Sequence, residues 1–329
     1  MTISAAERLR RFYAVFSGHD HVLIGINADP DAIASAMAAK RLLWRKVAGV
    51  TISNINVIKR PDNITMIRLM GIDLVHISKI DKSRYSRFII IDSQPCHNEA
   101  FATITPDAVI DHHPETGAKA SFLDIRPKYG ATASIMTEYL RAAKIKPSAK
   151  LAAGLYYAIK TDTNNFAGQA LMEDLRAFQF LFHHANIHLA RKIEKADLNF
   201  NFLKFFKIAL EGMKRRRGRL FAHLGSVANP DVCVIIADFF MRVDAVNWSI
   251  ISGLYNKKLV LIFRNDGLRE DAGKLAGDRF GQIGSAGGHK SMARAEIPVA
   301  NLTAHVDFRD EKKLLMWIIG QIEKSAVKK

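Results

Sequence analysis

The chain has 329 residues, of which 49% are hydrophobic and 24% are charged. This composition is typical of a globular protein and excludes a disordered chain. The length exceeds the usual size of one hydrophobic core, so we expect two domains. The formal net charge of +16 favours polyanionic partners, but it does not distinguish nucleic acid from polyphosphate.

The chain has two cysteines, Cys96 and Cys233, and no Cys-x-x-Cys pair. A cysteine-based zinc site is therefore excluded, and a disulfide framework is not expected. Residues 1–11 are charged and lack the apolar stretch of a signal peptide, and no apolar run reaches the length that spans a bilayer. We therefore expect a cytoplasmic protein with no membrane partner.

Residues 21–195 alternate between short apolar runs and helical stretches. The expected strands are residues 22–26, 88–91 and 108–110, and the expected helices are residues 32–47, 132–143 and 152–159. Each expected strand is a continuous apolar run, which is typical of parallel strands that are buried on both faces. The pattern predicts an α/β domain with a parallel sheet and helices on both faces.

Residues 196–219 form a basic, phenylalanine-rich segment that we predict to be a helical connector. It ends in a run of cations from Lys214 to Arg219. We favour a solvated helix end for this run, because cations complement the helix dipole there, over a dedicated site for a polyanion.

Residues 220–329 predict a second, smaller α/β domain. The expected strands are residues 232–236 and 259–263, and the expected helices are residues 243–254 and 311–324. A glycine-rich segment at 273–288 precedes the last helix.

Acidic and histidine motifs stand near the ends of the elements of the first domain. They are Asp29-Pro30-Asp31 after the first strand, Asp92 after the second, Asp111-His112-His113 after the third, and Thr161-Asp162-Thr163 after a helix. Because the carboxyl ends of parallel strands meet at one edge of a sheet, we expect these side chains to converge.

The chemistry of this set points to a divalent metal. Carboxylates together with imidazole suit Mn²⁺ or a similar ion better than an all-oxygen Ca²⁺ cage. Two such ions about 4 Å apart neutralise phosphoryl oxygens and activate a water. A single aspartate at a strand end is often a helix N-cap or a turn residue, but that explanation accounts poorly for all the motifs together.

In this order the motifs resemble those of the DHH phosphoesterases, which carry Asp-x-Asp, a lone Asp, Asp-His-His and an Asp in a Thr-Asp-Thr context. The subfamily with a DHHA1 domain adds a Gly-Gly-His motif, which here is Gly287-Gly288-His289. The resemblance implies a DHH metal-binding catalytic domain over residues 1–195 and a substrate-binding DHHA1 domain over residues 220–329. Within the family, the chain is similar to RecJ-like proteins of the bacterial oligoribonuclease and 3′-phosphoadenosine phosphate phosphatase type.

The resemblance also implies three sets of site residues. The metal ligands would be Asp29, Asp31, Asp92, His112 and Asp162. The catalytic residues would be Asp92, Asp111 and His113. The substrate-binding residues would be His113, Arg264, Gly287, Gly288 and His289. Asp92 would bridge two metals, Asp29 would serve the first, and Asp111 would orient the histidines, as ligating imidazoles commonly require.

The chain departs from the family pattern at one position. The family places a histidine four residues before the first aspartate of Asp-x-Asp, and this chain has Gly25 there. His21 lies about 13 Å further back along a strand, which is too far for its side chain to replace that ligand. His97 is the nearest alternative, and we do not expect it to be a ligand. We therefore expect one tightly bound metal and a weaker second one.

The resemblance implies a hydrolase that acts on phosphoester bonds by metal-activated water. Mn²⁺ is the expected cofactor, with Mg²⁺ as the alternative. The expected substrates are short single-stranded oligonucleotides, degraded by exonuclease action, or small nucleotides such as 3′-phosphoadenosine phosphate. One alternative function is that of an exopolyphosphatase or cyclic-dinucleotide phosphodiesterase. A second alternative is a non-catalytic nucleotide-binding regulatory protein whose first metal site is degenerate at Gly25. A homodimer also stays open.

Overall fold

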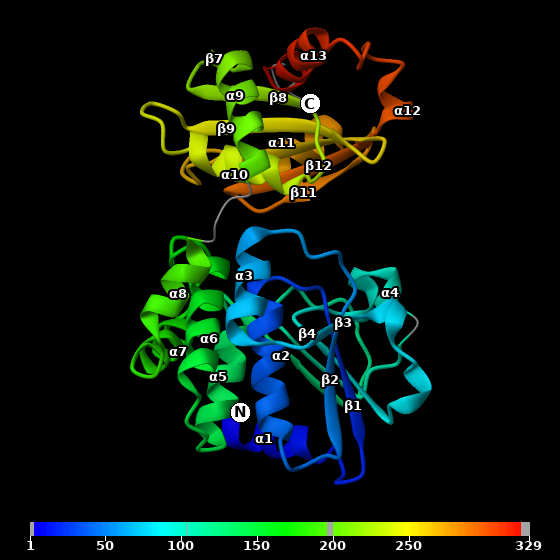
Figure 1. The fold of residues 1–329 in the computed structure, drawn as a ribbon, viewed down its shortest axis with the longest axis vertical. Helices are drawn as coiled ribbons and strands as arrows, with labels where there is room; N and C mark the ends of the chain where they lie inside the picture. The colour runs from blue at the N-terminus through cyan, green and yellow to red at the C-terminus, as the bar shows by residue number, and fades with distance from the viewer. Residues whose placement is uncertain (1–2, 103, 196–199, 324–329) are drawn as a thin grey trace. The chain divides into compact units, whose positions relative to one another are not determined.

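The computed structural model describes residues 3–102, 104–195 and 200–323. The chain divides into two compact units, Met1–Asp197 and Leu198–Lys329, which are shown in Figure 1. The structure does not describe residues 1–2 and 324–329 at the two ends of the chain. Residues 196–199, the first part of the predicted connector, also lie outside the described residues. Each unit contains a six-stranded sheet.

The sheet of the first unit is parallel throughout, with strand order β3-β2-β1-β4-β5-β6. Its strands are β1 (His21–Ile26), β2 (Gly49–Asn54), β3 (Leu74–His76), β4 (Arg87–Ile91), β5 (Ala108–Asp111) and β6 (Phe122–Ile125). The predicted α/β fold with a parallel sheet is therefore confirmed. All the strands point the same way, so residues that follow them lie at one edge of the sheet.

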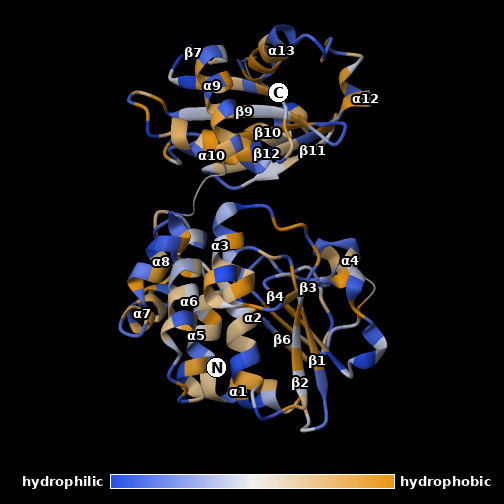
Figure 2. Ribbon diagram, viewed as in Figure 1, coloured by the Kyte–Doolittle hydropathy of each residue, from blue (hydrophilic) through white to orange (hydrophobic). Residues whose placement is uncertain are grey.

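Both faces of this sheet are covered. Ile89 and Ile91 of β4 belong to the main core, whereas Ile90 packs with Phe101 and Val109 on the opposite face. Figure 2 shows hydrophobic residues along these strands. Burial on both sides explains why β1, β4 and β5 contain continuous apolar runs.

Seven helices contribute buried residues to the main core. One short α-helix and three short 3-10 helices complete the described helical elements of this unit. The seven are α1 (Ala5–Tyr13), α2 (Pro30–Leu43), α3 (Pro61–Met70), α5 (Thr132–Ala142), α6 (Ala149–Asp162), α7 (Met172–Phe182) and α8 (Ile187–Glu194). The others are α4 (Glu99–Ala102), η1 (Ile77–Lys79), η2 (Lys82–Arg84) and η3 (Pro95–His97).

The sheet of the second unit is mixed, with strand order β11-β12-β10-β9-β8-β7, and only its β8–β9 pairing is parallel. Its strands are β7 (Lys214–Arg216), β8 (Arg219–Ser226), β9 (Trp248–Tyr255), β10 (Lys258–Asn265), β11 (Ser285–Gly288) and β12 (Met292–Pro298). Its helical elements are η4 (Phe200–Phe202), α9 (Leu203–Gly212), α10 (Asp231–Phe240), α11 (Ala272–Phe280), α12 (Val299–Leu302) and α13 (Glu311–Glu323).

The strands of the second sheet also pack on both faces. Along β10, Leu261 and Phe263 pack with residues of α11 and α13, whereas Val260 and Ile262 pack with residues of α9 and α10. This alternation follows from the two-residue period of a strand. The predicted strand at 259–263 and the described part of the predicted helix at 311–324 match β10 and α13.

Two sequence predictions in this unit are wrong. Residues 232–236, predicted as a strand, form the first half of α10, whose buried residues Val232, Ile236 and Phe240 recur at helical spacing. Residues 243–254, predicted as a helix, contain most of β9, a central strand whose residues 248–253 are all buried. A short apolar run does not separate a buried helix from a buried strand by its pattern alone.

The predicted helical connector is also wrong in its second half. Helix α9 ends at Gly212, and Phe205 and Ala209 of this helix belong to a core of the second unit. The basic run then forms the β7–β8 hairpin rather than a helix end. Arg217 and Gly218, the two residues of the turn, both have positive φ, as type I′ hairpin turns require. Among the described residues, none of the helices combines the length and the apolar character that a membrane-spanning helix requires.

Candidate metal centre

The candidate site lies where the strands of the first unit end. Asp29 is the N-cap of α2, and Asp31 lies in the first turn of that helix. Asp92 follows β4 with a φ of 58°, a left-handed conformation that aspartate adopts more readily than most residues. His112 follows β5, and Asp162 is the last residue of α6. Segments far apart in the sequence therefore meet at one edge of the sheet.

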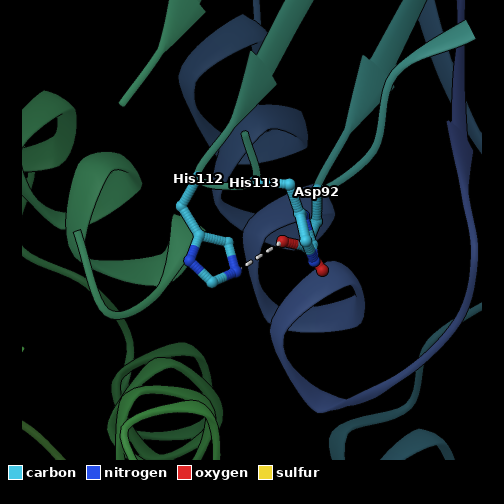
Figure 3. Close-up of side chains that lie close together, drawn as sticks. All are labelled: Asp92, His112 and His113. Atoms are coloured by element: carbon cyan, nitrogen blue, oxygen red, sulfur yellow. Dashed lines mark ion pairs between the residues drawn. The ribbon is translucent and has the colours of Figure 1, made fainter. Parts of the chain in front are cut away.

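Three carboxylates surround the Nε2 atom of His112. This nitrogen lies 3.3 Å from Asp162 Oδ2, 3.6 Å from Asp92 Oδ1 and 3.9 Å from Asp31 Oδ2. Figure 3 shows His112 and Asp92 pointing toward each other, with His113 beside Asp92. Ligand atoms about 2.1 Å from one shared ion lie about 3 to 4 Å apart, so this spacing fits a single divalent ion.

The two ring nitrogens of His112 have different roles. Nδ1 lies 3.2 Å from the carbonyl oxygen of Tyr129, which only accepts, so Nδ1 carries the proton when the ring is neutral. Nε2 is buried and has no hydrogen-bond partner among the described residues. In the neutral ring, the lone pair of Nε2 points at the carboxylates, which is the arrangement of a metal-ligating imidazole that a backbone carbonyl orients.

The start of helix α5 holds Asp31 and Asp92, and the sequence did not reveal this. The backbone N–H groups of Thr132 and Ala133 donate to Asp31 Oδ2 at 2.6 Å and to Asp31 Oδ1 at 2.8 Å. The hydroxyl of Thr132 donates to Asp92 Oδ1 at 2.8 Å, and that of Ser35 donates to Asp31 Oδ1 at 3.2 Å. A helix N-terminus favours a carboxylate, so these bonds fix the two side chains in place.

Asp111 orients the two histidines that follow it. Its Oδ1 accepts hydrogen bonds from the backbone N–H of His112 at 2.8 Å and from Nδ1 of His113 at 2.8 Å. Its Oδ2 accepts from the buried amide of Gln94 at 2.7 Å, and Gln94 in turn accepts from Thr116 at 2.6 Å. Gln94 is thus a second supporting residue that the motifs did not indicate.

The crowded carboxylates change one another's pKa values. Burial and Asp31 raise the pKa of Asp29 to about 6, and burial and Asp162 raise the pKa of Asp31 to about 7. Burial and neighbouring carboxylates raise the pKa of Asp92 well above its ordinary value, and burial raises that of Asp162. Burial lowers the pKa of His112, but Asp162 and Asp31 outweigh it and bring the value to about 9. A divalent cation would relieve this excess of negative charge.

The residues around Asp29 provide fewer candidate ligands for a second metal ion. Asp29 Oδ1 accepts from the backbone N–H of Ala32 at 2.9 Å and so caps α2. Among the described residues, no trio of candidate ligands within 4.8 Å of one another includes Asp29. A Cβ atom at Gly25 would lie 3.0 Å from Cε1 of Phe101, so this ring takes the space beside the glycine. The residues present fit one ion better than two.

The predicted substrate residues of the second unit lie near one end of its sheet. Gly287 and Gly288 close β11, and Gly288 has a φ of 152°, where a Cβ would clash with the carbonyl oxygen of Met292. The backbone N–H of His289 donates to the same oxygen at 2.7 Å, and the residue is exposed. Arg264 of β10 is in register with Met292 and pairs with an aspartate of α10. Their contact with a substrate stays a prediction.

The first unit is thus an α/β domain with a parallel sheet, and its candidate metal site consists of aspartates that surround one histidine at the strand ends. Residues 21–159 match the DHH family, N-terminal domain. The first unit therefore contains a DHH-family domain, and the resemblance expected from the motifs is confirmed.

Several known proteins share similarity with the chain. An uncharacterized protein of Methanocaldococcus jannaschii is 31% identical over 295 residues, which cover 89% of this chain and 61% of that protein. An exopolyphosphatase-related protein of Bacteroides fragilis is 15% identical, with a TM-score of 0.75 and 98% of both chains covered. A pGpG-specific phosphodiesterase of Vibrio cholerae is 14% identical, with a TM-score of 0.44, over 92% of this chain and 99% of that one. The Bacteroides structure shows that the fold is shared.

Proposed function

We propose that the chain is a divalent-metal-dependent phosphoesterase with Mn²⁺ as its cofactor. The observation that carries this proposal is the buried Nε2 of His112, which faces three carboxylates and has no hydrogen-bond partner among the described residues. Three carboxylates and one imidazole form a donor set that suits Mn²⁺. Asp31, Asp92, His112 and Asp162 would hold the ion, and Asp29 would contribute only to a weaker second site.

The residues around the ion have distinct tasks in this proposal. A bound divalent ion supplies charge for the phosphoryl oxygens and activates a water. His113 donates from Nδ1 to Asp111, so its Nε2 faces outward with a fixed orientation for the substrate phosphate. Asp111 holds both histidines and does not itself need to contact the substrate.

We propose short single-stranded oligonucleotides or small nucleotides as substrates. The net charge of +16 supports a polyanionic substrate, although it does not choose among polyanions. Arg264, Gly287, Gly288 and His289 of the second unit would bind the substrate, because an exposed histidine next to glycines leaves room for a phosphate. The name of the Bacteroides relative makes polyphosphate the second substrate to test.

The test is the Mn²⁺-dependent release of mononucleotides from a short RNA. We expect activity in the unmodified protein and its loss in Asp92→Ala, because this change removes a ligand from the metal site. Asp73→Ala is the matched control, since Asp73 is exposed and precedes β3, at the opposite edge of the sheet from the strand ends. A 3′,5′-bisphosphorylated adenosine, a cyclic dinucleotide and polyphosphate complete the panel. No activity above the Asp92→Ala background on any of them would favour a binding protein instead.

A further inference from the structure

Three histidines form a row that begins at the metal centre. The rings of His112 and His113 are 4.6 Å apart between centroids, and those of His113 and His97 are 5.6 Å apart. A ring nitrogen of His97 lies within 4.8 Å of candidate ligand atoms of Asp111 and His113. His97 ends the 3-10 helix η3 and is exposed, so it forms the solvent-facing end of the row.

The hydrogen bonds of His97 define which of its nitrogens carries the proton. The backbone N–H of Gln94 donates to His97 Nδ1 at 3.2 Å, and an N–H group only donates, so Nδ1 is the acceptor. The proton of the neutral ring is therefore on Nε2. Among the described residues, Nε2 of His97 has no hydrogen-bond partner. His97 thus presents an N–H donor.

This assignment separates two roles for His97. A metal ligand must offer a lone pair, which Nε2 does not have in this state. A phosphoryl oxygen is an anionic acceptor, and a free N–H donor beside it makes a charge-assisted hydrogen bond. A donor at this position would compensate for a missing metal ligand, because Gly25 has no side chain to bind a metal and the ring of Phe101 occupies the space beside it. A substrate phosphate would therefore lack part of the positive charge that a first metal provides.

We propose that His97 is a phosphate-binding residue, whose Nε2–H donates to a phosphoryl oxygen of a substrate that lies beside His113. This inference rests on the proposed function, because it assigns a further contact at the same site. It goes beyond the motifs, which give His97 no role.

Two substitutions separate binding of phosphate from support of the loop. His97→Asn keeps an acceptor near the position of Nδ1 for the N–H of Gln94, but it has no donor at the position of Nε2. His97→Gln extends a donor to the position of Nε2 but loses the acceptor. If His97 binds phosphate, the Asn variant behaves like His97→Ala and the Gln variant retains most of the binding. If His97 only supports η3, the Asn variant retains most of the phosphate binding and the Gln variant behaves like His97→Ala.

The experiment is isothermal titration of the full-length, Mn²⁺-loaded protein with inorganic phosphate, preceded by a Mn²⁺ titration of each variant. We expect unchanged Mn²⁺ affinity and a phosphate affinity that is about tenfold or more weaker in His97→Asn and His97→Ala, as expected for a lost bond to a charged group. Unchanged phosphate affinity in His97→Asn, or no measurable phosphate binding by the unmodified protein, overturns the inference. Hydrolysis is scored separately, so a protein that binds phosphate through His97 but hydrolyses nothing refutes only the proposed function.

Discussion

The hydroxyl of Thr132 donates a hydrogen bond of 2.8 Å to Asp92 Oδ1. The backbone N–H of the same residue donates to Asp31 Oδ2 at 2.6 Å. Thr132 is fully buried, so water does not take over either bond. One residue at the start of α5 therefore positions two of the three carboxylates around His112.

Thr132→Val should weaken Mn²⁺ binding about 10-fold to 100-fold, because it removes the hydroxyl that orients Asp92 while keeping the shape of the side chain. Thr137→Val is the matched control, since Thr137 is buried in the same helix and donates to the carbonyl oxygen of Ala133. Thr132→Ser should bind Mn²⁺ nearly as the unmodified protein does. Calorimetric titration measures all three, and equal affinities for the two valine variants would contradict this role of Thr132.

Asp111→Asn should lower both stability and activity. The groups that contact the two carboxylate oxygens of Asp111 are all hydrogen-bond donors. Asparagine replaces one of these oxygens with an NH2 group, so one donor then faces another donor. A buried mismatch of this kind costs about 1–3 kcal/mol, which denaturant unfolding measures. Adding Gln94→Glu gives the new amide a carboxylate partner but removes the N–H that donates to the carbonyl oxygen of Pro114, so it should recover only part of the loss. Additive effects of the two changes would argue against this network.

The response of the protein to metal should depend on pH. Without metal, the pKa values of about 6 for Asp29 and about 7 for Asp31 exceed the ordinary value of about 4. Protonation of a carboxyl whose pKa is higher in the folded state than in the unfolded state stabilises the fold. For Asp29 and Asp31 this stabilisation is complete below about pH 4, the unfolded pKa, and is lost as the pH rises toward 7, through their folded pKa values. The metal displaces these protons, so Mn²⁺ should raise the melting temperature more near pH 8 than near about pH 5.5. Scanning fluorimetry tests this, and equal shifts at both pH values would refute it.

The unmodified protein should retain one tightly bound Mn²⁺ after dialysis. Gly25→His alone should destabilise the fold, because a Cβ at this position already lies 3.0 Å from the ring of Phe101. Combining it with Phe101→Ala makes room for the imidazole and should increase the metal content, whereas Phe101→Ala alone should not. Elemental analysis counts the metal in each variant. Two tightly held ions in the unmodified protein would overturn the expectation.

The sequence predicted strands β1, β4 and β5 of the first unit because they are apolar runs, buried on both faces, that are followed by motifs, whereas β2, β3 and β6 were not predicted. A continuous apolar run such as residues 88–91, followed by Asp92, indicates both a buried strand and a residue at the edge of the sheet. The convergence of Asp31, Asp92, His112 and Asp162 follows from this topology once the strands are parallel.

Other features depend on tertiary contacts that local patterns do not carry. The run at 232–236 is rich in β-branched residues, yet its burial at helical spacing between the sheet and α9 makes it a helix. Thr132 contacts Asp31 across 101 positions of sequence, and its role follows only from where α5 begins. The ring of Phe101 beside Gly25 likewise comes from packing on the far face of the sheet.

The most direct measurement is a crystal structure of the protein soaked with Mn²⁺, in which anomalous diffraction locates the ion. We expect a strong peak within coordination distance of His112 Nε2 and of carboxylate oxygens of Asp31, Asp92 and Asp162. A peak elsewhere, or no peak at a Mn²⁺ concentration that saturates the protein in solution, would contradict the assignment of this site.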